Sequence, residues 1–368
     1  MGINTAFSSL PNPADAANDL SNKLIGYDPK MVLFFASSNY DPNTIAAAMK
    51  NAFPKSLTFG CSTSGEIVSG QMLKNSVVAM AFDGPAMLDA KVVVMKNIKT
   101  GNPVQQAFGE FEAYFKTPMR DLDFTKYIGI ILIDGMSGAE EKIMEKIGDL
   151  TDVTFIGASA GDDLKFKETY VYAGGIAYTD AAILALLKPG TPFDLIKTQS
   201  FNELPAKLVA TKVDAASRTV HEFNNRPALQ AYAQALGVQP SEAASRFMHN
   251  PIGLMDDGEP YVRSPQQAKG DDIVFYCNVK QGMELSVLES QDIVADTRAV
   301  IEAKNAEMNG ISGIINFHCI LRTLELEKKN QTEAYGKIFS DIPTIGFSTY
   351  GEQYIGHINQ TSTMLIFK

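Results

Sequence analysis

Pro343-Thr-Ile-Gly-Phe-Ser-Thr-Tyr-Gly-Glu-Gln-Tyr-Ile-Gly-His-Ile-Asn-Gln-Thr361 is the stretch from which the rest of the chain can be interpreted. A short apolar run leads into a turn over 346–352, which begins at Gly346, contains Gly351 and ends at Glu352. Glycine lets a backbone approach a neighbour, or adopt a positive φ, without a Cβ clash. Hydroxyls, a phenol and a carboxylate lie within the turn, so the stretch predicts a functional loop at the end of a buried strand.

The same turn occurs twice more in the chain. Residues 60–66 read Gly-Cys-Ser-Thr-Ser-Gly-Glu and match 346–352 at the Gly, Ser, Thr, Gly and Glu positions. Residues 157–162 read Gly-Ala-Ser-Ala-Gly-Asp and are one residue shorter. An apolar run, a helical pattern and a second apolar run precede each copy, which is a β-α-β signature. The sequence therefore predicts a mixed α/β (α+β) fold with repeated strand–helix–strand–glycine-turn units in two mixed-sheet domains.

Local signals place the boundaries of these segments. Asn12 and Pro13 predict the start of a helix within 1–29. A first domain is expected over 30–220, and a turn-rich shift in composition near 220–260 predicts a second domain over 221–368. Ser137 with Glu140 predicts a capping box at the start of the helix in the second repeat.

Composition limits the classes of function. The formal net charge is −10, which disfavours nucleic acid and anionic membrane surfaces as partners. Three widely spaced cysteines without a Cys-x-x-Cys motif indicate a reducing compartment. The N-terminus lacks a signal-peptide pattern, and no apolar run is long enough to span a bilayer, so a cytoplasmic protein is expected.

Histidine and arginine near the third turn are the candidates for ligand chemistry. A neutral imidazole is a good axial ligand for haem iron, and His318 is placed at the end of an apolar strand and the start of a helix. His357 follows the last turn. For either histidine, a hydrogen-bonded structural role is the alternative. Arg322, one helical turn after His318, suits a carboxylate, or alternatively forms a structural pair with Glu325 or Glu352.

Two further patterns have both a functional and a structural interpretation. Gly157-Ala-Ser159-Ala-Gly161 fits the Gly-x-Ser-x-Gly nucleophile motif of serine hydrolases, which needs a helix after the serine. The sister turns break that motif, so repetition explains the match better. Glu66 and Glu352 occupy equivalent positions in two turns, and hydrogen bonds inside a tight turn are the favoured role for them.

Taken together, several segments resemble the FIST family (F-box and intracellular signal transduction proteins). They are 60–67, 157–163, 250–255, 258–263, 319–322 and 346–352. The resemblance covers an N-terminal FIST part over about 30–220 and a C-terminal part over about 221–355. It implies a sensory module that binds small ligands, not an enzyme. Stand-alone bacterial members include haem-containing nitric-oxide sensors that act on a separate histidine kinase or cyclic-di-GMP enzyme, and this chain is similar to that group.

The leading interpretation is thus a cytoplasmic sensor that binds haem, with nitric oxide as the signal and His318 as the metal ligand. A metal-free sensor of an amino acid or small carboxylate is the first alternative, and a hydrolase using Ser159 is the second. A homodimer is compatible with either sensor. The candidate cofactor- or ligand-binding residues are His318, His357, Arg322, Ser348, Tyr350, Gly351, Glu352 and Asn359.

Overall fold

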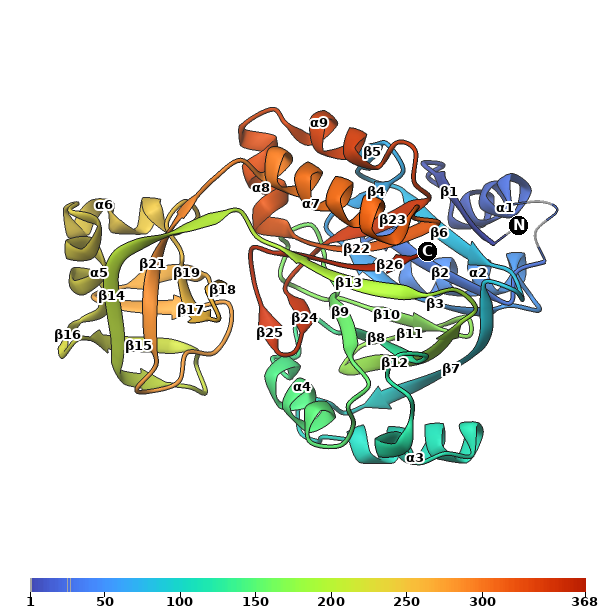
Figure 1. Cartoon of the computed structure of the whole chain (residues 1–368), viewed down its shortest axis with the longest axis horizontal. Helices are drawn as coiled ribbons and strands as arrows, with labels where there is room; N and C mark the ends of the chain where they lie inside the picture. Colours follow the sequence, from blue (N-terminus) through green and yellow to red (C-terminus); the bar gives the residue numbers. More distant parts are fainter. Residues whose placement is uncertain (1, 25, 27) are drawn as a thin grey trace. The chain divides into compact units, whose positions relative to one another are not determined.

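The structure, a computed structural model, describes residues 2–24, 26 and 28–368. The chain divides into two compact units (Figure 1). The larger unit comprises 1–197, 297–357 and 362–368, and the smaller unit comprises 198–296 and 358–361. Both units are discontinuous along the chain. The predicted boundary near residue 220 instead divides the sequence into two consecutive segments, and this boundary stays a prediction.

The larger unit contains three copies of one arrangement, here called repeats 1, 2 and 3. Each repeat has an outer strand, a helix, two parallel strands joined by a second helix, a short hairpin and a closing strand. In repeat 3 most residues of the smaller unit are inserted between the outer strand and the first helix, and its short segment 358–361 precedes the closing strand. This arrangement confirms the predicted mixed α and β fold class and the repetition behind the three glycine turns.

The elements of each repeat follow the same order. Repeat 1 has β1 (Ile3–Ser8), α1 (Pro13–Lys23), β2 (Met31–Ser37), α2 (Pro42–Ala52), β3 (Leu57–Thr63), β4 (Glu66–Val68), β5 (Gln71–Leu73) and β6 (Val77–Phe82). Repeat 2 has β7 (Met87–Lys96), α3 (Val104–Phe115), β8 (Ile128–Ile133), α4 (Glu140–Gly148), β9 (Phe155–Ser159), β10 (Val171–Ala173), β11 (Ile176–Tyr178) and β12 (Ala181–Pro189). Repeat 3 has β13 (Phe193–Thr198), α7 (Ile293–Met308), β22 (Gly313–Cys319), α8 (Ile320–Lys328), α9 (Thr332–Gly336), β23 (Thr344–Thr349), β24 (Glu352–Tyr354), β25 (His357–Ile358) and β26 (Ser362–Phe367).

The repeats exchange their hairpins in a cycle. The strand orders are β1-β6-β2-β3-β10-β11, β7-β12-β8-β9-β24-β25 and β13-β26-β22-β23-β4-β5. The hairpin of repeat 1 therefore extends the sheet of repeat 3, that of repeat 3 extends the sheet of repeat 2, and that of repeat 2 extends the sheet of repeat 1. Each glycine turn is thus the point where the chain passes from one sheet to the next.

The three turns also bond directly to one another. The first and third turns are joined by backbone bonds from Ser64 N to Ser348 O (3.1 Å) and from Ser348 N to Gly65 O (2.8 Å). The second and third turns are joined by bonds from Ser159 N to Gly351 O (2.9 Å) and from Tyr350 N to Ser159 O (3.2 Å). A bond from Gly161 N to Ser62 O (3.0 Å) joins the first and second turns. Every pair of turns is therefore joined, and residues far apart in sequence form one junction.

The first glycine of each turn is required by the neighbouring strand. A Cβ atom at Gly60 would lie 1.8 Å from the Phe34 carbonyl oxygen, and one at Gly157 would lie 1.7 Å from that of Ile131. The corresponding distance at Gly346 is 2.3 Å, to the carbonyl oxygen of Asn316. Because these partners are backbone atoms, no rotamer change can relieve the clash. The repeated glycine is thus a consequence of close approach between the two parallel strands.

Apolar side chains fill the space between the sheets and under most of the helices. The inner faces of the three sheets share one core, to which Phe35, Leu132 and Phe317 contribute. On the outer faces, α1 and α2 cover repeat 1, and α3 and α4 cover repeat 2, each over an apolar layer. The sheet therefore carries alternating inward and outward apolar residues, as expected for strands buried on both faces.

The N-terminal ends of α1 and α4 test the two helix caps predicted from the sequence. Asn12 Oδ1 accepts bonds from Ala14 N (2.9 Å) and Asp15 N (3.1 Å), so the predicted cap of α1 is confirmed. The predicted capping box of α4 is wrong, because the N-cap residue of α4 is Ala139 and no side chain caps it. Ser137 lies before the helix, and the Glu140 carboxylate accepts a bond from Ser159 instead.

The smaller unit is built around an antiparallel sheet. Its strands are β14 (Phe201–Asp214), β15 (Thr219–Phe223), β16 (Arg226–Pro227), β17 (Ile252–Asp256), β18 (Glu259–Arg263), β19 (Pro265–Lys269), β20 (Asp272–Phe275) and β21 (Glu284–Ser290), with helices α5 (Ala228–Leu236) and α6 (Pro240–Ala243). Phe223, Tyr232 and Phe275 contribute to its apolar core.

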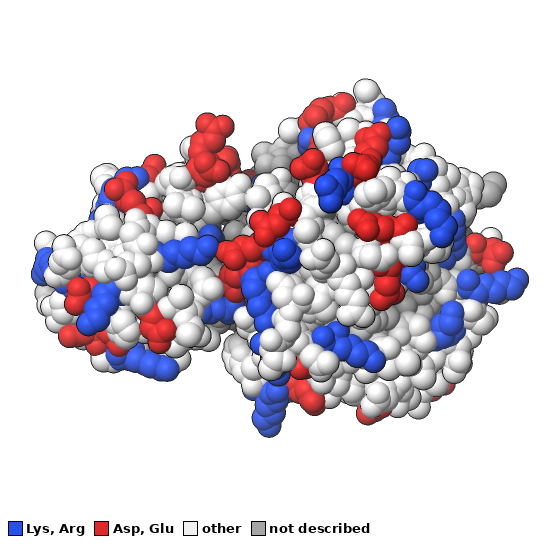
Figure 2. Space-filling view, turned by 90° about the horizontal axis from the view of Figure 1, so that it is seen from below, with Lys and Arg blue, Asp and Glu red and all other residues white. Residues whose placement is uncertain are grey.

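Charged residues are spread over the surface. On the face drawn in Figure 2, acidic and basic side chains alternate with uncharged residues. Within the part of the chain that the structure describes, no helix has both the length and the apolar character needed to cross a membrane.

Candidate functional site

Repeat 3 differs from its sister repeats in the layer between sheet and helices. Strand pairing places His318 opposite Ser348, just as Ala36 lies opposite Ser62 and Ile133 opposite Ser159. These outward-facing positions are alanine and isoleucine in repeats 1 and 2 but histidine in repeat 3. Two residues earlier, Phe34 and Ile131 correspond to Asn316. Polar side chains thus replace apolar ones toward the carboxyl end of β22. Burying polar groups lowers the stability of the fold unless the groups are hydrogen-bonded.

A chain of hydrogen bonds runs through this polar layer. Ser362 Oγ donates to Asn316 Oδ1 (2.7 Å), and Asn316 Nδ2 donates to the Tyr335 hydroxyl (3.2 Å). The Tyr335 hydroxyl also bonds His318 Nδ1 (2.9 Å), with the two rings 4.6 Å apart. All four side chains are buried. The other ring nitrogen of His318, Nε2, has no hydrogen-bond partner among the described residues.

Arg322 lies beside this chain in the first turn of α8. Its side chain is only 1% exposed, and it is the largest of the fully buried side chains. Nη2 donates to Thr297 Oγ1 of α7 (3.1 Å), whereas Nε and Nη1 have no partner among residues 2–24, 26 and 28–368. Arginine stays protonated in proteins, and buried charges are normally paired. The layer therefore holds a buried positive charge that the described residues do not neutralise.

Burial and the positive charge of Arg322 both lower the pKa of His318 well below its usual value. His318 is therefore neutral at pH 7, and among the described members of this layer named above Arg322 carries the charge. Among the described residues, a neutral imidazole with one unpartnered nitrogen thus lies beside a guanidinium that has no counter-charge, and such an imidazole nitrogen can act as a hydrogen-bond partner or as a metal ligand.

Comparison with known protein families decides the family. The chain matches the FIST N domain over residues 30–226 and the FIST C domain over residues 228–355. This protein belongs to the FIST family. FIST domains are sensory, ligand-binding domains associated with signal transduction. The expected resemblance to the FIST family, with its N-terminal and C-terminal parts, is therefore confirmed.

One relative gives a further comparison. An uncharacterised protein of Methanocaldococcus jannaschii is 23% identical over 278 residues, which is 70% of this FIST chain. The match covers 53% of that protein, so the chain spans about half the length of this curated relative.

The sequence expectation placed His318 at the end of an apolar strand and the start of a helix, with Arg322 one turn below it on that helix. In this FIST protein the strand end is confirmed, whereas a position of His318 on the helix itself is wrong. β22 extends to Cys319, because its ladder with β23 continues through His318 and Cys319, and α8 begins only at Ile320. The histidine and the arginine thus come from a strand and from the following helix, and the two meet in the layer between them.

The expected structural pair of Arg322 with Glu325 or Glu352 is not formed among the described residues. Glu325 bonds Lys329 at 2.7 Å, and Glu352 accepts a bond from Thr349 Oγ1. Within the part of the chain that the structure describes, the guanidinium hydrogen-bonds the neutral Thr297 side chain and no carboxylate. Of the two roles expected for Arg322, a ligand contact is the one that the geometry leaves open.

The residues of the third glycine turn mostly support the junction between repeats. Ser348 Oγ bonds Thr323 Oγ1 of α8 (2.7 Å), and the Gly351 carbonyl accepts from Ser159 N. The Tyr350 hydroxyl donates to Asp162 and accepts from Leu164 N (2.7 Å), and burial raises the pKa of Tyr350. Tyr350 therefore fastens the 162–168 loop to the junction and lies outside the polar layer under α8.

Glu66 and Glu352 have the equivalent local bonds that repetition predicts. Thr63 Oγ1 donates to Glu66 and Thr349 Oγ1 donates to Glu352, each across three residues. Glu66 also accepts from Ser76 Oγ (2.6 Å) and Ser76 N (3.1 Å). Burial raises the pKa of Glu66 to about 7, with its hydrogen bonds acting in the opposite direction.

His357 and Asn359 do not join the His318 group through any described bond. The His357 ring bonds the Gln353 side chain at 3.1 Å, and Gln353 Nε2 donates to Ser159 Oγ (3.2 Å). Asn359 is buried and belongs to the 358–361 segment of the smaller unit.

Ser159 lacks the surroundings of a hydrolase nucleophile. Its hydroxyl donates to the Glu140 carboxylate (3.1 Å), and the amide of Gln353 lies between it and His357. After Ser159 the chain continues to strand β10, whereas a nucleophile elbow requires a helix. The Gly-x-Ser-x-Gly match therefore arises from the repeated turn.

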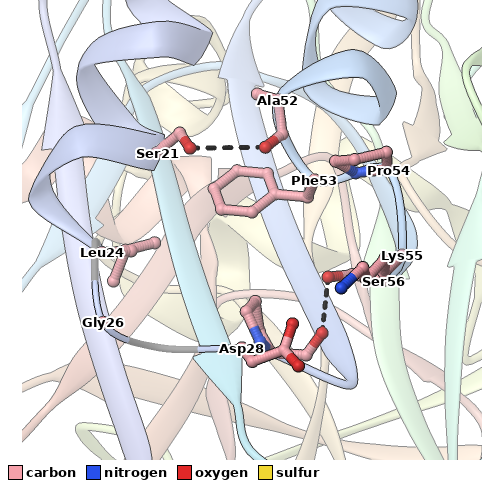
Figure 3. Close-up of a pocket in the computed structure, with 10 residues that line it drawn as sticks. Ser21, Leu24, Gly26, Asp28, Ala52, Phe53, Pro54, Lys55 and Ser56 are labelled. Carbon is pink, nitrogen blue, oxygen red and sulfur yellow. Dashed lines mark hydrogen bonds between the residues drawn. The ribbon is translucent and has the colours of Figure 1, made fainter.

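One surface pocket lies away from the polar layer of repeat 3. Figure 3 shows a pocket of about 250 Å³ between α1 and the end of α2, where Ser21 bonds the Ala52 carbonyl (3.3 Å) and Ser56 bonds that of Pro29 (2.5 Å). Its hydroxyls are thus already satisfied. Within the described residues, no group of three or more His, Cys, Asp or Glu side chains could hold a metal ion.

Sequence reasoning missed several members of the polar layer. They are Asn316, Tyr335, Ser362 and Thr297. Asn316 and His318 alternate along an otherwise apolar strand, and this alternation was the available signal. Tyr335 and Thr297 gave none, because each lies on a separate helix whose apolar pattern they fit.

Proposed function

We propose that this FIST protein is a cytoplasmic sensor that binds a small ligand in the polar layer of repeat 3 and thereby controls a separate signalling enzyme. The observation that carries the proposal is Arg322, whose buried guanidinium has two unpartnered nitrogens among the described residues. A buried charge without a counter-charge lowers the free energy of unfolding by roughly several kcal/mol. A ligand that neutralises Arg322 would account for the presence of such a charge in the fold. A folded protein without such a ligand would gain stability by replacing the arginine.

The position of Arg322 also suits a sensor. Its Nη2 links α8 to Thr297 of α7, so a ligand that draws the guanidinium toward itself competes with the bond between the two helices. A ligand shifts a conformational equilibrium only by binding one state better than the other. The two helices over the polar layer therefore supply the difference between a ligand-free and a ligand-bound state.

Haem is one specific candidate for this ligand, with nitric oxide as the signal. The observation that favours it is His318 Nε2, which is buried, unpartnered among the described residues and belongs to a neutral ring. Arg322 would then face a haem propionate, which is a carboxylate. In this case His318 would hold the iron, and the bound group would supply the affinity for nitric oxide.

Ligand binding is tested on the full chain by thermal unfolding and visible absorption. Hemin and the sodium salts of small carboxylic acids are added separately to wild type, His318→Gln and Arg322→Met. A ligand present at 100 times its dissociation constant raises stability by about 2.7 kcal/mol. Stabilisation that is lost in Arg322→Met supports the site, whereas an unchanged response in both variants would place the ligand elsewhere.

The signalling half of the proposal has its own test. A histidine kinase or a cyclic-di-GMP enzyme of the same organism is assayed with the sensor, with and without the ligand found above. We expect the ligand to change the enzyme's rate in the presence of wild type but not of Arg322→Met. Equal rates in all four mixtures would refute the regulatory role of this partner.

A further inference from the structure

The hydrogen-bond chain in the polar layer determines which nitrogen of His318 carries its proton. Ser362 donates to Asn316 Oδ1, which orients the amide so that Nδ2 donates to the Tyr335 oxygen. The Tyr335 proton is then directed to His318 Nδ1, its closest remaining acceptor at 2.9 Å. Ser362 Oγ, the alternative acceptor, is 3.5 Å away, which is beyond the usual range. Nδ1 thus accepts a bond, and the proton of the neutral ring resides on Nε2.

Every unpartnered group at the site is consequently a donor. Arg322 offers Nε and Nη1, and His318 offers Nε2–H. A guanidinium presents its N–H groups in two planar pairs that match carboxylate oxygens, and Nε and Nη1 belong to different pairs, because Cδ lies between them. A ligand that satisfies this set must supply acceptor oxygens and a negative charge.

The start of α8 favours an anion for an independent reason. The N-terminus of a helix carries a partial positive charge, which an acidic side chain usually compensates. Asp41 caps α2 in repeat 1 by accepting from Thr44 N (2.8 Å), and Glu140 and Glu141 lie in the first turn of α4 in repeat 2. α8 is the equivalent helix of repeat 3, and among the described residues its first turn contains no acid and no side-chain cap.

Among the described residues, the first turn of α8 thus has no carboxylate of the kind found at the starts of α2 and α4, and it holds the buried cation of Arg322. In repeat 2 the Glu140 carboxylate accepts from Ser159, the residue equivalent to Ser348. In repeat 3 the Ser348 hydroxyl instead bonds the neutral Thr323 hydroxyl of α8 (2.7 Å), so no acid of the chain compensates this end of the helix among the described residues.

We propose that the ligand of this sensor is a small carboxylic acid, whose carboxylate accepts hydrogen bonds from the Arg322 guanidinium and from His318 Nε2–H at the start of α8. This inference rests on the proposed function and narrows its ligand to one chemical class.

The same geometry disfavours haem as the direct partner of His318. An iron atom binds the Nε2 lone pair, so the ring proton has to move to Nδ1. Tyr335 then accepts from both His318 and Asn316, and its own proton is left with the Ser362 acceptor at 3.5 Å. The two ligand classes therefore require opposite tautomers of one histidine.

The tautomer is measured directly by ¹⁵N NMR of histidine-labelled full-length protein, with His318→Gln to assign the signal. We expect His318 Nε2 to be protonated, and Tyr335→Phe to release this preference without loss of the fold. Because Tyr335 acts through His318, it is a positioning residue, and a merely structural role would leave the tautomer unchanged. An Nε2 without a proton in the wild type would overturn the proposal.

Binding is measured by calorimetry on the same protein, refolded to remove any bound molecule. The probes are acetate, pyruvate, succinate and benzoate, each beside its neutral amide, with inorganic phosphate and hemin in parallel. We expect at least one acid to bind, its amide to fail, and Arg322→Met to weaken the acid by about tenfold to a hundredfold. Native mass spectrometry of freshly purified protein should then reveal an acid as an adduct that Arg322→Met lacks.

The failures are distinguishable. Binding of hemin but of no acid refutes the carboxylate and leaves the sensor proposal intact. Binding of phosphate in preference to every acid refutes the carboxylate but keeps an anion at Arg322. Binding of none of the probes, together with purified protein free of adducts, refutes both this inference and the proposed function.

Discussion

Replacing Arg322 by methionine tests the central physical argument, namely that this buried charge has no counter-charge among the described residues. Methionine has a similar length and no polar donor, so it removes the charge with little loss of volume. Each buried unsatisfied donor costs about 1–3 kcal/mol, and Arg322 has two of them among the described residues. The bond to Thr297, which the substitution also removes, contributes about 1.5–3 kcal/mol. We therefore expect ligand-free Arg322→Met to be as stable as wild type or more stable by about 1–3 kcal/mol.

The assay is hydrogen exchange of the β22 and β23 amides in ligand-free full-length protein, which reports the opening free energy of the larger unit. Arg298→Met, on the exposed face of α7, is the matched control and should stay within about 0.5 kcal/mol of wild type. Breaking a paired buried ion costs about 3–5 kcal/mol. A loss of that size in Arg322→Met would show that the guanidinium already has an internal counter-charge and would refute the reasoning.

Three further predictions follow from the junction between the repeats. Gly157→Ala places a methyl group 1.7 Å from the Ile131 carbonyl oxygen and should lower the free energy of unfolding by about 3 kcal/mol, whereas Gly109→Ala, in open space on α3, should raise it by about 0.5–1 kcal/mol. Urea unfolding compares the two, and a Gly157→Ala variant as stable as wild type would contradict the strand spacing. Because the pKa of Glu66 rises from 4.5 to about 7, the folded state binds the extra proton in that window, and stability falls as the pH rises through it. Glu66→Gln should remove this dependence of the free energy of unfolding on pH, which amounts to about 3 kcal/mol at most. A pH profile of unfolding that is the same in the variant and the wild type would argue against the raised pKa of Glu66. Tyr350→Phe removes the hydroxyl that bonds Asp162 and Leu164 N, so hydrogen exchange in 162–168 should accelerate while the β22 amides keep their protection; equal rates in both proteins would show that the loop does not depend on this hydroxyl.

The repeated strand–helix–strand–turn pattern could be predicted because its causes are local. An apolar run, a helical period and a glycine where two strands approach closely all occur within about 35 residues of one another. The cap at Asn12 was predictable for the same reason. The capping box at Ser137 and Glu140 was predicted wrongly, because Glu140 bonds Ser159 across a tertiary contact that no local signal announces.

The candidate site likewise combines features that local sequence predicts with features that depend on tertiary contacts. His318 and Arg322 were chosen from the sequence because their residue types suit ligands and because they follow the third apolar strand. The helical spacing assumed for them was wrong, since the β22–β23 ladder keeps His318 in the strand. Tyr335, which determines the tautomer of His318, comes from α9, and only packing brings the two rings together.

Residue types and local patterns were enough to indicate the family, the fold class, the three related units and the polar residues at the end of the third strand. Three features required the folded arrangement: the cyclic exchange of hairpins between repeats, the bonds among the three turns, and the unpartnered nitrogens of Arg322 among the described residues. The physical reason is that propensity and periodicity act between neighbours in the chain. Whether a buried charge has a partner depends on groups that folding brings together from distant segments, and a sequence pattern contains no distances between them.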